Sequence, residues 1–436
     1  MKRYWLTLIL ISLLMLVACT KAIVQPAVTI TPTPSTERVA PQLTSTPTLT
    51  PTATLHPTVT ASATPTPYPV DFPLGDVQYR IPPIIRFLDQ DEVTIFFELD
   101  QPVEGKVLVI DESGDWVQEQ AWEAEETRHM ITFEGLNPGI SYQLIPVITA
   151  TAGWTAPMFQ GQAWSLDCTL QNGEFPLRIG VISDASFGDE VTRQFVAEMA
   201  SADLDFVLHL GDVVDETEWD VDPYASYAEN FFTPFAPLLK QMPVYTVIGN
   251  HDYDADIRYN EEPFYFTVFP AAPQMADRQY YSFTYNDIRF LFLDAMTLWG
   301  MPGRKAQEEW LAEQLADTET TTIILSHIAP FSSSSVHPDD SAPFQNLWVP
   351  QFEGANVPLV LSGHFHHYER LNVNGITYIV AGGGSQVTYA LGQYLPESEV
   401  VQRVSHYVIL ELRAEEIHLS AIDVDGTIID EVVIAD

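Results

Sequence analysis

The chain has 436 residues, of which 46% are hydrophobic, and its formal net charge is −40. This length and apolar content are sufficient for more than one globular unit. An excess of carboxylates of this size repels a nucleic-acid backbone, so we do not expect the protein to bind a nucleic-acid scaffold.

The first nineteen residues have the pattern of an export signal. Lys2 and Arg3 precede an apolar run that is too short to span a bilayer comfortably, and the run ends in the sequence LVAC. This ending resembles the signal of bacterial lipoproteins, which implies that residues 1–18 are a signal peptide and that Cys19 is acylated. The protein would then be membrane-anchored and extracytoplasmic, at the cell surface or in the periplasm. An ordinary signal peptide and an uncleaved anchor helix are the alternatives. The remaining cysteine, Cys168, is interpreted as a small buried residue.

Two segments lie between the predicted signal peptide and the large carboxy-terminal segment of the chain. Residues 19–69 are rich in Thr, Pro and Ser and contain few large apolar residues, which predicts a disordered tether. Residues 70–166 show strand-like alternation in "VTIFFEL" and "GKVLVID" without a helical period, which predicts a small all-β sandwich. "LNPGISY" resembles the corner of fibronectin type III modules, with Tyr142 as the corner tyrosine. A generic hairpin turn is the alternative for this stretch.

Residues 167–436 alternate apolar strands with helices, which predicts an α/β unit with sheets covered by helices. The strands are expected within "LRIGVIS", "LDFVLHLGDVV", "PVYTVIGNHD", "TTIILSH" and "VPLVLSGH". Helices are expected within "DEVTRQFVAEMASA", "YAENFFTPFAPLLKQ" and "RKAQEEWLAEQLAD". A hairpin is expected in "YYSFTYNDIRFLFLD", and further strands close the chain.

These strands end in side chains that can bind metal. The side chains at or just beyond the strand ends are Asp184, Asp212, Asn250, His251, His327, His364 and His366. Because the carboxyl ends of such strands line one crevice, we expect these groups to converge. Carboxylate, amide and imidazole ligands together suit Fe, Mn or Zn, and one carboxylate can bridge two ions. The pattern therefore predicts a dinuclear metal site.

Three other histidines are interpreted separately. His367 directly follows His366 and points in a different direction, so it either supports the ligands or contacts the edge of a substrate. His209 lies inside a strand and is interpreted as a core residue. His337 lies on a loop and faces either the substrate or nothing.

The motifs "GDVVD", "GNHD", "LSH" and "GHFH", in this order, resemble those of calcineurin-like metallophosphoesterases. "GHFHHYER" followed by "VNGITYIVAGGGS" resembles the purple acid phosphatase branch, which also carries a fibronectin-like amino-terminal domain. The resemblance implies a β-sandwich flanked by helices and metal-dependent hydrolysis of phosphate esters, as in acid phosphatases. It also implies that Asp212 bridges two ions, that Asp184 and His366 bind the first, and that Asn250, His327 and His364 bind the second. His251 would be the proton donor.

The first motif departs from this family. The general family has Asp-x-His there, and the purple branch has Asp-x-Gly with a tyrosine in Gly-Asp-x-x-Tyr, whereas this chain has Asp184-Ala-Ser and Gly-Asp-Val-Val-Asp. The first ion is therefore one ligand short, and Asp215, Ser186 or water could supply the missing oxygen. Without the tyrosine, iron-loaded protein is not expected to be purple. The alternative functions are a phosphodiesterase or nucleotidase of the same fold, and a tethered binding or adhesion protein with weakened catalysis.

Overall fold

The structure is a computed structural model that describes residues 72–151, 153–215, 222–253, 262–273, 275 and 279–435. The predicted signal peptide, Cys19 and the tether lie outside the described residues. All described residues fall within one compact unit. Within this described part, no helix combines the length and the apolar character needed to cross a membrane.

The first part of the described chain contains only strands. They form one nine-stranded sheet with the order β4-β3-β6-β7-β1-β2-β5, in which β8 pairs with β7 and β9 with β6. Their bounds are β1 Leu74–Leu88, β2 Glu92–Leu99, β3 Gly105–Asp111, β4 Trp116–Trp122, β5 Arg128–Glu134, β6 Ser141–Ala150, β7 Gly153–Phe159, β8 Gln162–Ala163 and β9 Leu166–Thr169. The sheet thus continues through Thr169, three residues beyond the predicted boundary.

The long strand β1 joins two halves of this sheet. Its beginning pairs with β7 and its end with β2, with register shifts between. The two halves pack on each other, since the ring centroids of Phe97 in β2 and Trp122 in β4 are 5.2 Å apart. The backbone N–H of Asn137 donates to Oη of Tyr142 at 3.0 Å, a hydrogen bond typical of the tyrosine corner in β-sandwiches. Likeness to fibronectin type III modules stays a prediction.

The second part contains two sheets that pack face to face. The six-stranded sheet has the order β12-β11-β10-β20-β21-β22, and the seven-stranded sheet has the order β13-β14-β15-β16-β18-β17-β19. Their strands are β10 Leu177–Ile182, β11 Phe206–His209, β12 Val244–Thr246, β13 Tyr281–Tyr285, β14 Ile288–Leu293, β15 Thr321–Ser326, β16 Leu359–Ser362, β17 Tyr368–Val373, β18 Ile376–Ala381, β19 Ser398–Gln402, β20 His406–Leu412, β21 Glu416–Asp423 and β22 Ile428–Ala435. One hydrophobic cluster between the sheets contains Val181, Phe290 and Leu361, among others.

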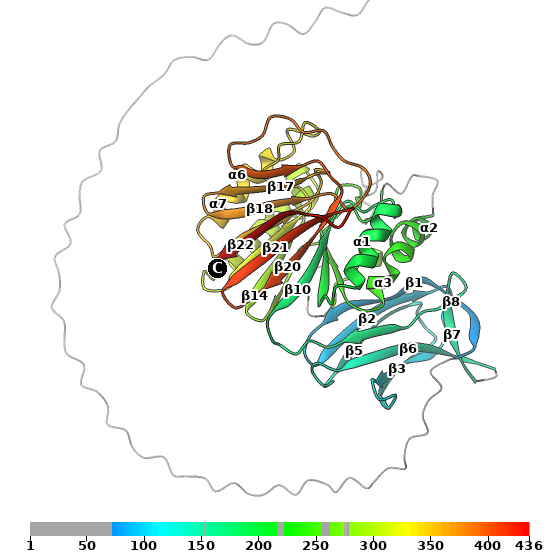
Figure 1. Ribbon diagram of the computed structural model, residues 1–436. Coiled ribbons are helices and arrows are strands. Elements are labelled where there is room, and N and C mark those ends of the chain that lie inside the picture. The colour runs from blue at the N-terminus through cyan, green and yellow to red at the C-terminus, as the bar shows by residue number, and fades with distance from the viewer. Residues whose placement is uncertain are drawn as a thin grey trace, which may run out of the picture. The chain divides into compact units, whose positions relative to one another are not determined.

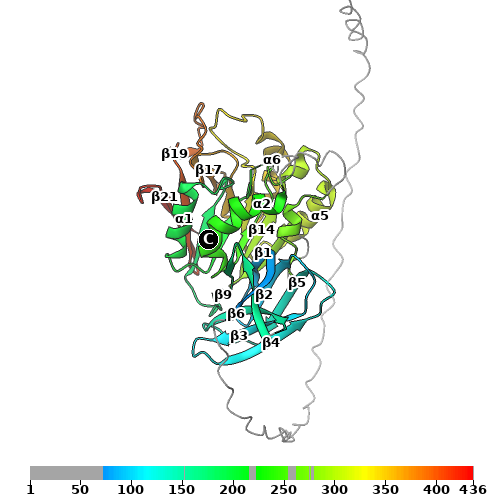
Figure 2. The same ribbon diagram turned by 90° about the vertical axis from the view of Figure 1, so that its right-hand side faces the viewer.

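Helices cover the outer faces of both sheets. They are α1 Glu190–Ala200, α2 Pro223–Tyr227, the π-helical turn η1 Ala228–Phe232, α3 Thr233–Leu239, α4 Tyr265–Val268, the 3₁₀ turn η3 Ala295–Trp299, α5 Arg304–Leu315, α6 Ala342–Leu347 and α7 Val349–Phe352. Figures 1 and 2 show α1 and α3 on one side of the strands and α5 and α6 on the other. The predicted α/β architecture of sheets with flanking helices is thereby confirmed.

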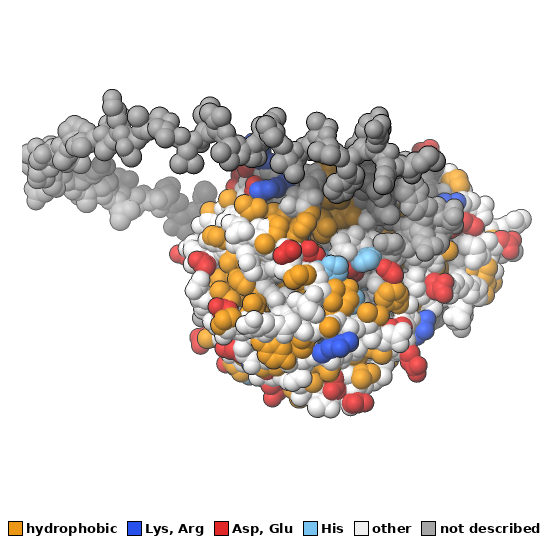
Figure 3. Space-filling model, turned by 90° about the horizontal axis from the view of Figure 1, so that it is seen from above, with side chains coloured by type: hydrophobic (Ala, Val, Ile, Leu, Met, Phe, Trp, Pro, Cys, Tyr) orange, Lys and Arg blue, Asp and Glu red, His pale blue; other side chains and the backbone are white. Residues whose placement is uncertain are grey.

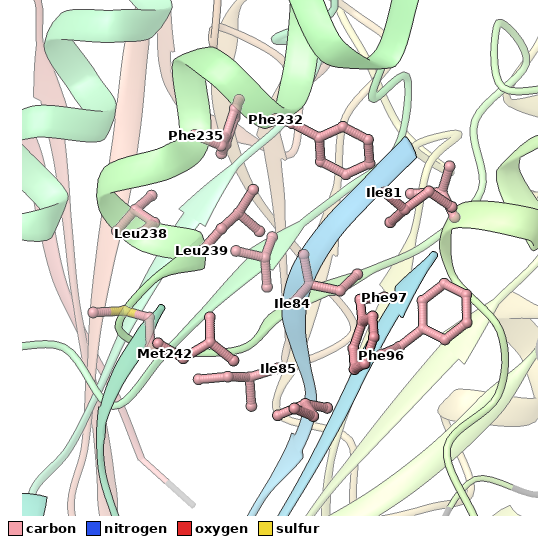
Figure 4. Close-up of a cluster of buried hydrophobic side chains, with 14 of the residues drawn as sticks. Ile81, Ile84, Ile85, Phe96, Phe97, Phe232, Phe235, Leu238, Leu239 and Met242 are labelled. Atoms are coloured by element: carbon pink, nitrogen blue, oxygen red, sulfur yellow. The ribbon is translucent and has the colours of Figure 1, made fainter. Parts of the chain in front are cut away.

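The strand-only part packs directly against α3. Ile81, Ile84 and Phe97 of β1 and β2 lie in the same buried cluster as Phe235 and Leu238 of α3 (Figure 4). The expected single helix over "YAENFFTPFAPLLKQ" is instead α2, η1 and α3 in succession, with Pro237 inside the last. Proline lacks the N–H of a helical hydrogen bond, which favours such irregular turns.

Candidate metal centre

The predicted ligands lie just beyond the ends of strands from both sheets. Neighbouring strands β10, β11 and β12 run parallel, as do β14, β15 and β16, so their carboxyl ends meet at one edge. His327 crosses from one sheet to the other, because its Nδ1 lies 2.8 Å from the carbonyl oxygen of Leu210. A carbonyl only accepts, so Nδ1 carries the proton and Nε2 faces the other predicted ligands.

Three of the predicted ligands adopt a left-handed backbone. The φ angles are 56° at Asp184, 52° at Asp212 and 66° at His364. Such conformations are unfavourable for residues other than glycine and cluster at functional sites. Hydrogen bonds hold them in place: the N–H of His364 donates to Asp184 Oδ2 at 3.0 Å, and the N–H of His251 donates to Asp212 Oδ1 at 2.9 Å.

The first cluster consists of Asp184, Asp212 and His327, which are all buried and offer ligand atoms within 4.8 Å of one another. His327 Nε2 lies 3.3 Å from Asp212 Oδ2 and 3.0 Å from Asn250 Oδ1. Burial alone would raise the pKa of Asp212, but His327 and His251 lower it well below its usual range. Burial would likewise lower the pKa of His327, yet Asp212 raises it to about 9. The carboxylate of Asp212 and the protonated imidazole of His327 therefore stabilise each other's charge.

Asp184 also meets His366. His366 Nε2 is 3.3 Å from Asp184 Oδ1, and that oxygen is buried without a hydrogen-bond donor among the described residues. Burial would raise the pKa of Asp184, but His366 lowers it, so the imidazole offsets part of the cost of burying this carboxylate. Oxygen and imidazole ligands of this kind suit Fe, Mn or Zn, so the residues present fit a metal centre.

A second cluster adjoins the first. It consists of His337, Asp340 and His364, with His364 Nε2 3.0 Å and His337 Nδ1 3.6 Å from Asp340 Oδ2. His337 thus faces Asp340 and His364, and a contact of His337 with a substrate stays a prediction. Asp340 was not predicted; an acidic residue on a polar loop gives no signal in the sequence beyond its spacing of three residues from His337.

His251 and Asp215 form a pair beside the first cluster. His251 Nδ1 lies 3.1 Å from Asp215 Oδ1, and His251 Nε2 lies 4.0 Å from Asp212 Oδ2. The side chains of His251 and Asp215 are 34% and 42% exposed. Asp215 belongs to neither three-residue cluster of the described chain, and the carbonyl of Ser186 accepts its N–H. The structure thus places Asp215 beside His251, and its role as a metal ligand stays a prediction.

Two other histidines are buried away from solvent. His367 is fully buried, and its Nε2 lies 3.0 Å from Oε2 of Glu369, which also accepts hydrogen bonds from Ser333 and Ser398. No surface of His367 is left for a substrate, and its support of the ligands stays a prediction. His209 is fully buried as expected, and burial lowers its pKa to about 4.

Tyr389 was not singled out in the sequence, yet it lies at the site. Its ring stacks on that of His366, with centroids 4.0 Å apart and planes 5° from parallel. The tyrosines near the predicted motifs face elsewhere: Tyr224 donates to Glu98, and Tyr253 to Asp294. On the face drawn in Figure 3, histidine side chains reach the surface beside acidic ones.

Part of the chain is similar to known proteins. Residues 177–368 match the family described as calcineurin-like phosphoesterase. Purple acid phosphatase 4 of Arabidopsis thaliana is 25% identical over 204 residues, which are 42% of this chain and 59% of that protein. The chain therefore matches about three-fifths of the length of this relative.

Two solved structures show the same fold. The purple acid phosphatase PPD1 from yellow lupin (Lupinus luteus) superposes with a TM-score of 0.63 at 18% identity, over 81% of this chain and 74% of that one. PhoD superposes with a TM-score of 0.58 at 14% identity, over 85% and 90% of the two chains. At these identities the superpositions show the fold alone. The match of residues 177–368 confirms the resemblance to calcineurin-like phosphoesterases, and the Arabidopsis relative confirms similarity to a purple acid phosphatase.

Proposed function

We propose that the protein hydrolyses phosphate esters at a centre of two metal ions, in the manner of an acid phosphatase. The observation that carries this proposal is the convergence of two carboxylates, an amide oxygen and three imidazoles at one edge of both sheets. The buried carboxylates of Asp184 and Asp212, whose ligand atoms lie within 4.8 Å of each other and of His327, support the presence of a cation.

The ligands divide into two groups around Asp212. Asp184 and His366 would hold one ion and Asn250, His327 and His364 the other, with Asp212 shared between them. Such ions, Fe, Mn or Zn, supply Lewis-acid activation of the ester and of the attacking water. The surrounding carboxylates repel an anionic substrate, so these ions would also provide the charge that attracts it.

His251 would donate the proton to the leaving group. Its Nδ1 faces Asp215 while its Nε2 lies on the side of Asp212, which leaves Nε2 to carry the transferred proton. We assign Asp215 to orienting His251. Asp215 or Ser186 as a ligand of the first ion stays an alternative from the sequence.

Two other functions follow from specific features. A phosphodiesterase or nucleotidase would use the same ligands. A tethered binding or adhesion protein would explain the first motif, which lacks the Asp-x-His and Gly-Asp-x-x-Tyr residues of the related enzymes. We further propose, from the sequence of residues 1–69, that acylated Cys19 anchors the protein outside the cytoplasm.

Removal and restoration of metal tests the proposal. The purified protein is treated with a chelator, assayed against phosphate monoesters and diesters, and supplied with Mn, Zn or Fe in turn. Activity that disappears and returns with metal supports the proposed centre, and the preferred ester separates phosphatase from diesterase. Full activity in the metal-free protein would rule out the mechanism, and inactivity under every loading would favour the binding protein.

A further inference from the structure

Tyr389 is attached to the predicted ligand His366 by two contacts. Beside the stacked rings, the backbone N–H of Tyr389 donates to the carbonyl oxygen of His366 at 2.8 Å. Parallel stacking of this kind fixes the orientation of both rings. The position of the Tyr389 hydroxyl is therefore tied to that of the ligand.

The loop that carries Tyr389 is held on both sides. Arg403 donates to the hydroxyl and the carbonyl of Thr388 at 3.2 and 3.3 Å. The N–H and the hydroxyl of Ser335 donate to the carbonyl of Ala390 at 2.9 and 2.8 Å. Because the residues before and after Tyr389 are both anchored, its side chain is preorganised rather than free to swing away.

The ring of Tyr389 adjoins both clusters. It stacks on His366 beside the first cluster, and its centroid lies 5.8 Å from that of His337 in the second. The hydroxyl makes no hydrogen bond to any described residue, although the ring is only partly buried. Stacking on His366 needs the ring alone, so packing does not account for a tyrosine hydroxyl at this position.

Stacking also argues against Tyr389 as a ligand of the same ion as His366. An ion bound to an imidazole nitrogen lies close to the plane of that ring, at a distance of about 2.0–2.1 Å from the nitrogen. Parallel rings cannot approach closer than about 3.5 Å. A phenol oxygen in the plane of the Tyr389 ring is thus too far from the imidazole plane for a bond to that ion.

The predicted ligands carry negative charge, which points to a role for a neutral hydrogen-bond donor beside them. Among the described residues, no lysine or arginine forms an ion pair with any of the predicted ligands or with His251. A phosphoryl group has three oxygens with negative charge to be matched, and hydrogen bonds to such oxygens are strong. We propose that the Tyr389 hydroxyl donates a hydrogen bond to a phosphoryl oxygen of the ester and thereby positions it for attack. The inference rests on the proposed function.

Tyr389→Phe tests the inference, because phenylalanine keeps the stacked ring and removes only the hydroxyl. The matched control is Tyr394→Phe, which removes a hydroxyl from a tyrosine on the same loop that is 56% exposed. Binding of inorganic phosphate to the metal-loaded full chain is measured by calorimetry, beside KM, kcat, metal content and the melting temperature. We expect Tyr389→Phe to weaken phosphate binding about tenfold or more, the scale of a hydrogen bond to a charged group. Its metal content and melting temperature should match those of the wild type and of Tyr394→Phe.

The outcomes separate this inference from the proposed function. If the wild type is active and Tyr389→Phe binds phosphate equally well, the inference is wrong and the function stands. If the wild type neither binds phosphate nor hydrolyses esters with any metal, both fail. If iron-loaded wild type shows a visible absorption band that Tyr389→Phe abolishes, Tyr389 is a metal ligand and the inference is overturned.

Discussion

Asp215 and Asp340 form two similar carboxylate–histidine pairs for which we predict different roles. Asp215 lies 3.1 Å from His251 and Asp340 lies 3.0 Å from His364, and the two aspartates are 42% and 33% exposed. His251 is the proposed proton donor, whereas His364 is a proposed ligand. Replacing each aspartate by asparagine removes the charge with little change in shape, so the two variants control for each other.

The expected effect of Asp215→Asn follows from its exposure. Ion pairs in contact with solvent contribute about 0.2–1 kcal/mol. Because about 1.4 kcal/mol corresponds to a tenfold change in rate, the variant should lower kcat by a factor of about 1.4 to 5. Loss of the proton donor itself in His251→Ala should lower kcat about 100-fold or more. The metal content of both variants should equal that of the wild type.

Asp340→Asn should act on the metal instead. Residues that support a ligating histidine typically change metal affinity by about 10- to 100-fold. Elemental analysis after dialysis against dilute chelator, together with kcat at saturating metal, distinguishes the two pairs. Loss of an ion from Asp215→Asn would show that Asp215 is the missing ligand of the first site. Loss of an ion from His251→Ala would refute the assignment of His251 as proton donor.

Three further predictions concern close packing, acid stability and the membrane. Gly363→Ala should lower the free energy of unfolding by about 1–3 kcal/mol and lower the metal content, because an added Cβ would lie 1.9 Å from Ser183 Oγ. The control is Gly354→Ala, whose added Cβ would meet no atom within 4 Å and which should leave chemical denaturation unchanged. Burial lowers the pKa of His129 to about 4, so the unfolded chain binds a proton at this residue more readily than the folded one. The free energy of unfolding therefore falls as the pH drops from about 6.5 toward 4. In urea unfolding at pH 5, His129→Phe should remove about 2 kcal/mol of this pH-dependent loss of stability. An unchanged pH dependence in that variant would contradict the burial argument. Cys19→Ser should release the protein from membranes, and its retention after a high-salt wash would indicate an uncleaved helix.

The sequence predicted the parts of the site that depend on strand direction. Asp184, Asp212 and His327 follow apolar strands, and the ends of parallel strands must meet at one edge. The pattern could not predict which way a side chain turns beyond the strand. Asp215 occupies the place of a ligand in the motif, but the local backbone brings it to His251. Tyr389 belongs to a long loop without periodicity, so its stacking depends on contacts with residues far away in the chain.

The strained backbone of the ligands explains why the site needs both sheets. Left-handed conformations at Asp184, Asp212 and His364 each cost about 1–3 kcal/mol, and the carboxylates repel one another at short range. The strands that precede these residues are fixed in two packed sheets, and hydrogen bonds from His251 and His364 link one ligand loop to another. A displacement at one ligand is therefore opposed by the core of both sheets. The two packed sheets, more than the loops, would thus hold the six proposed ligands in place for two ions.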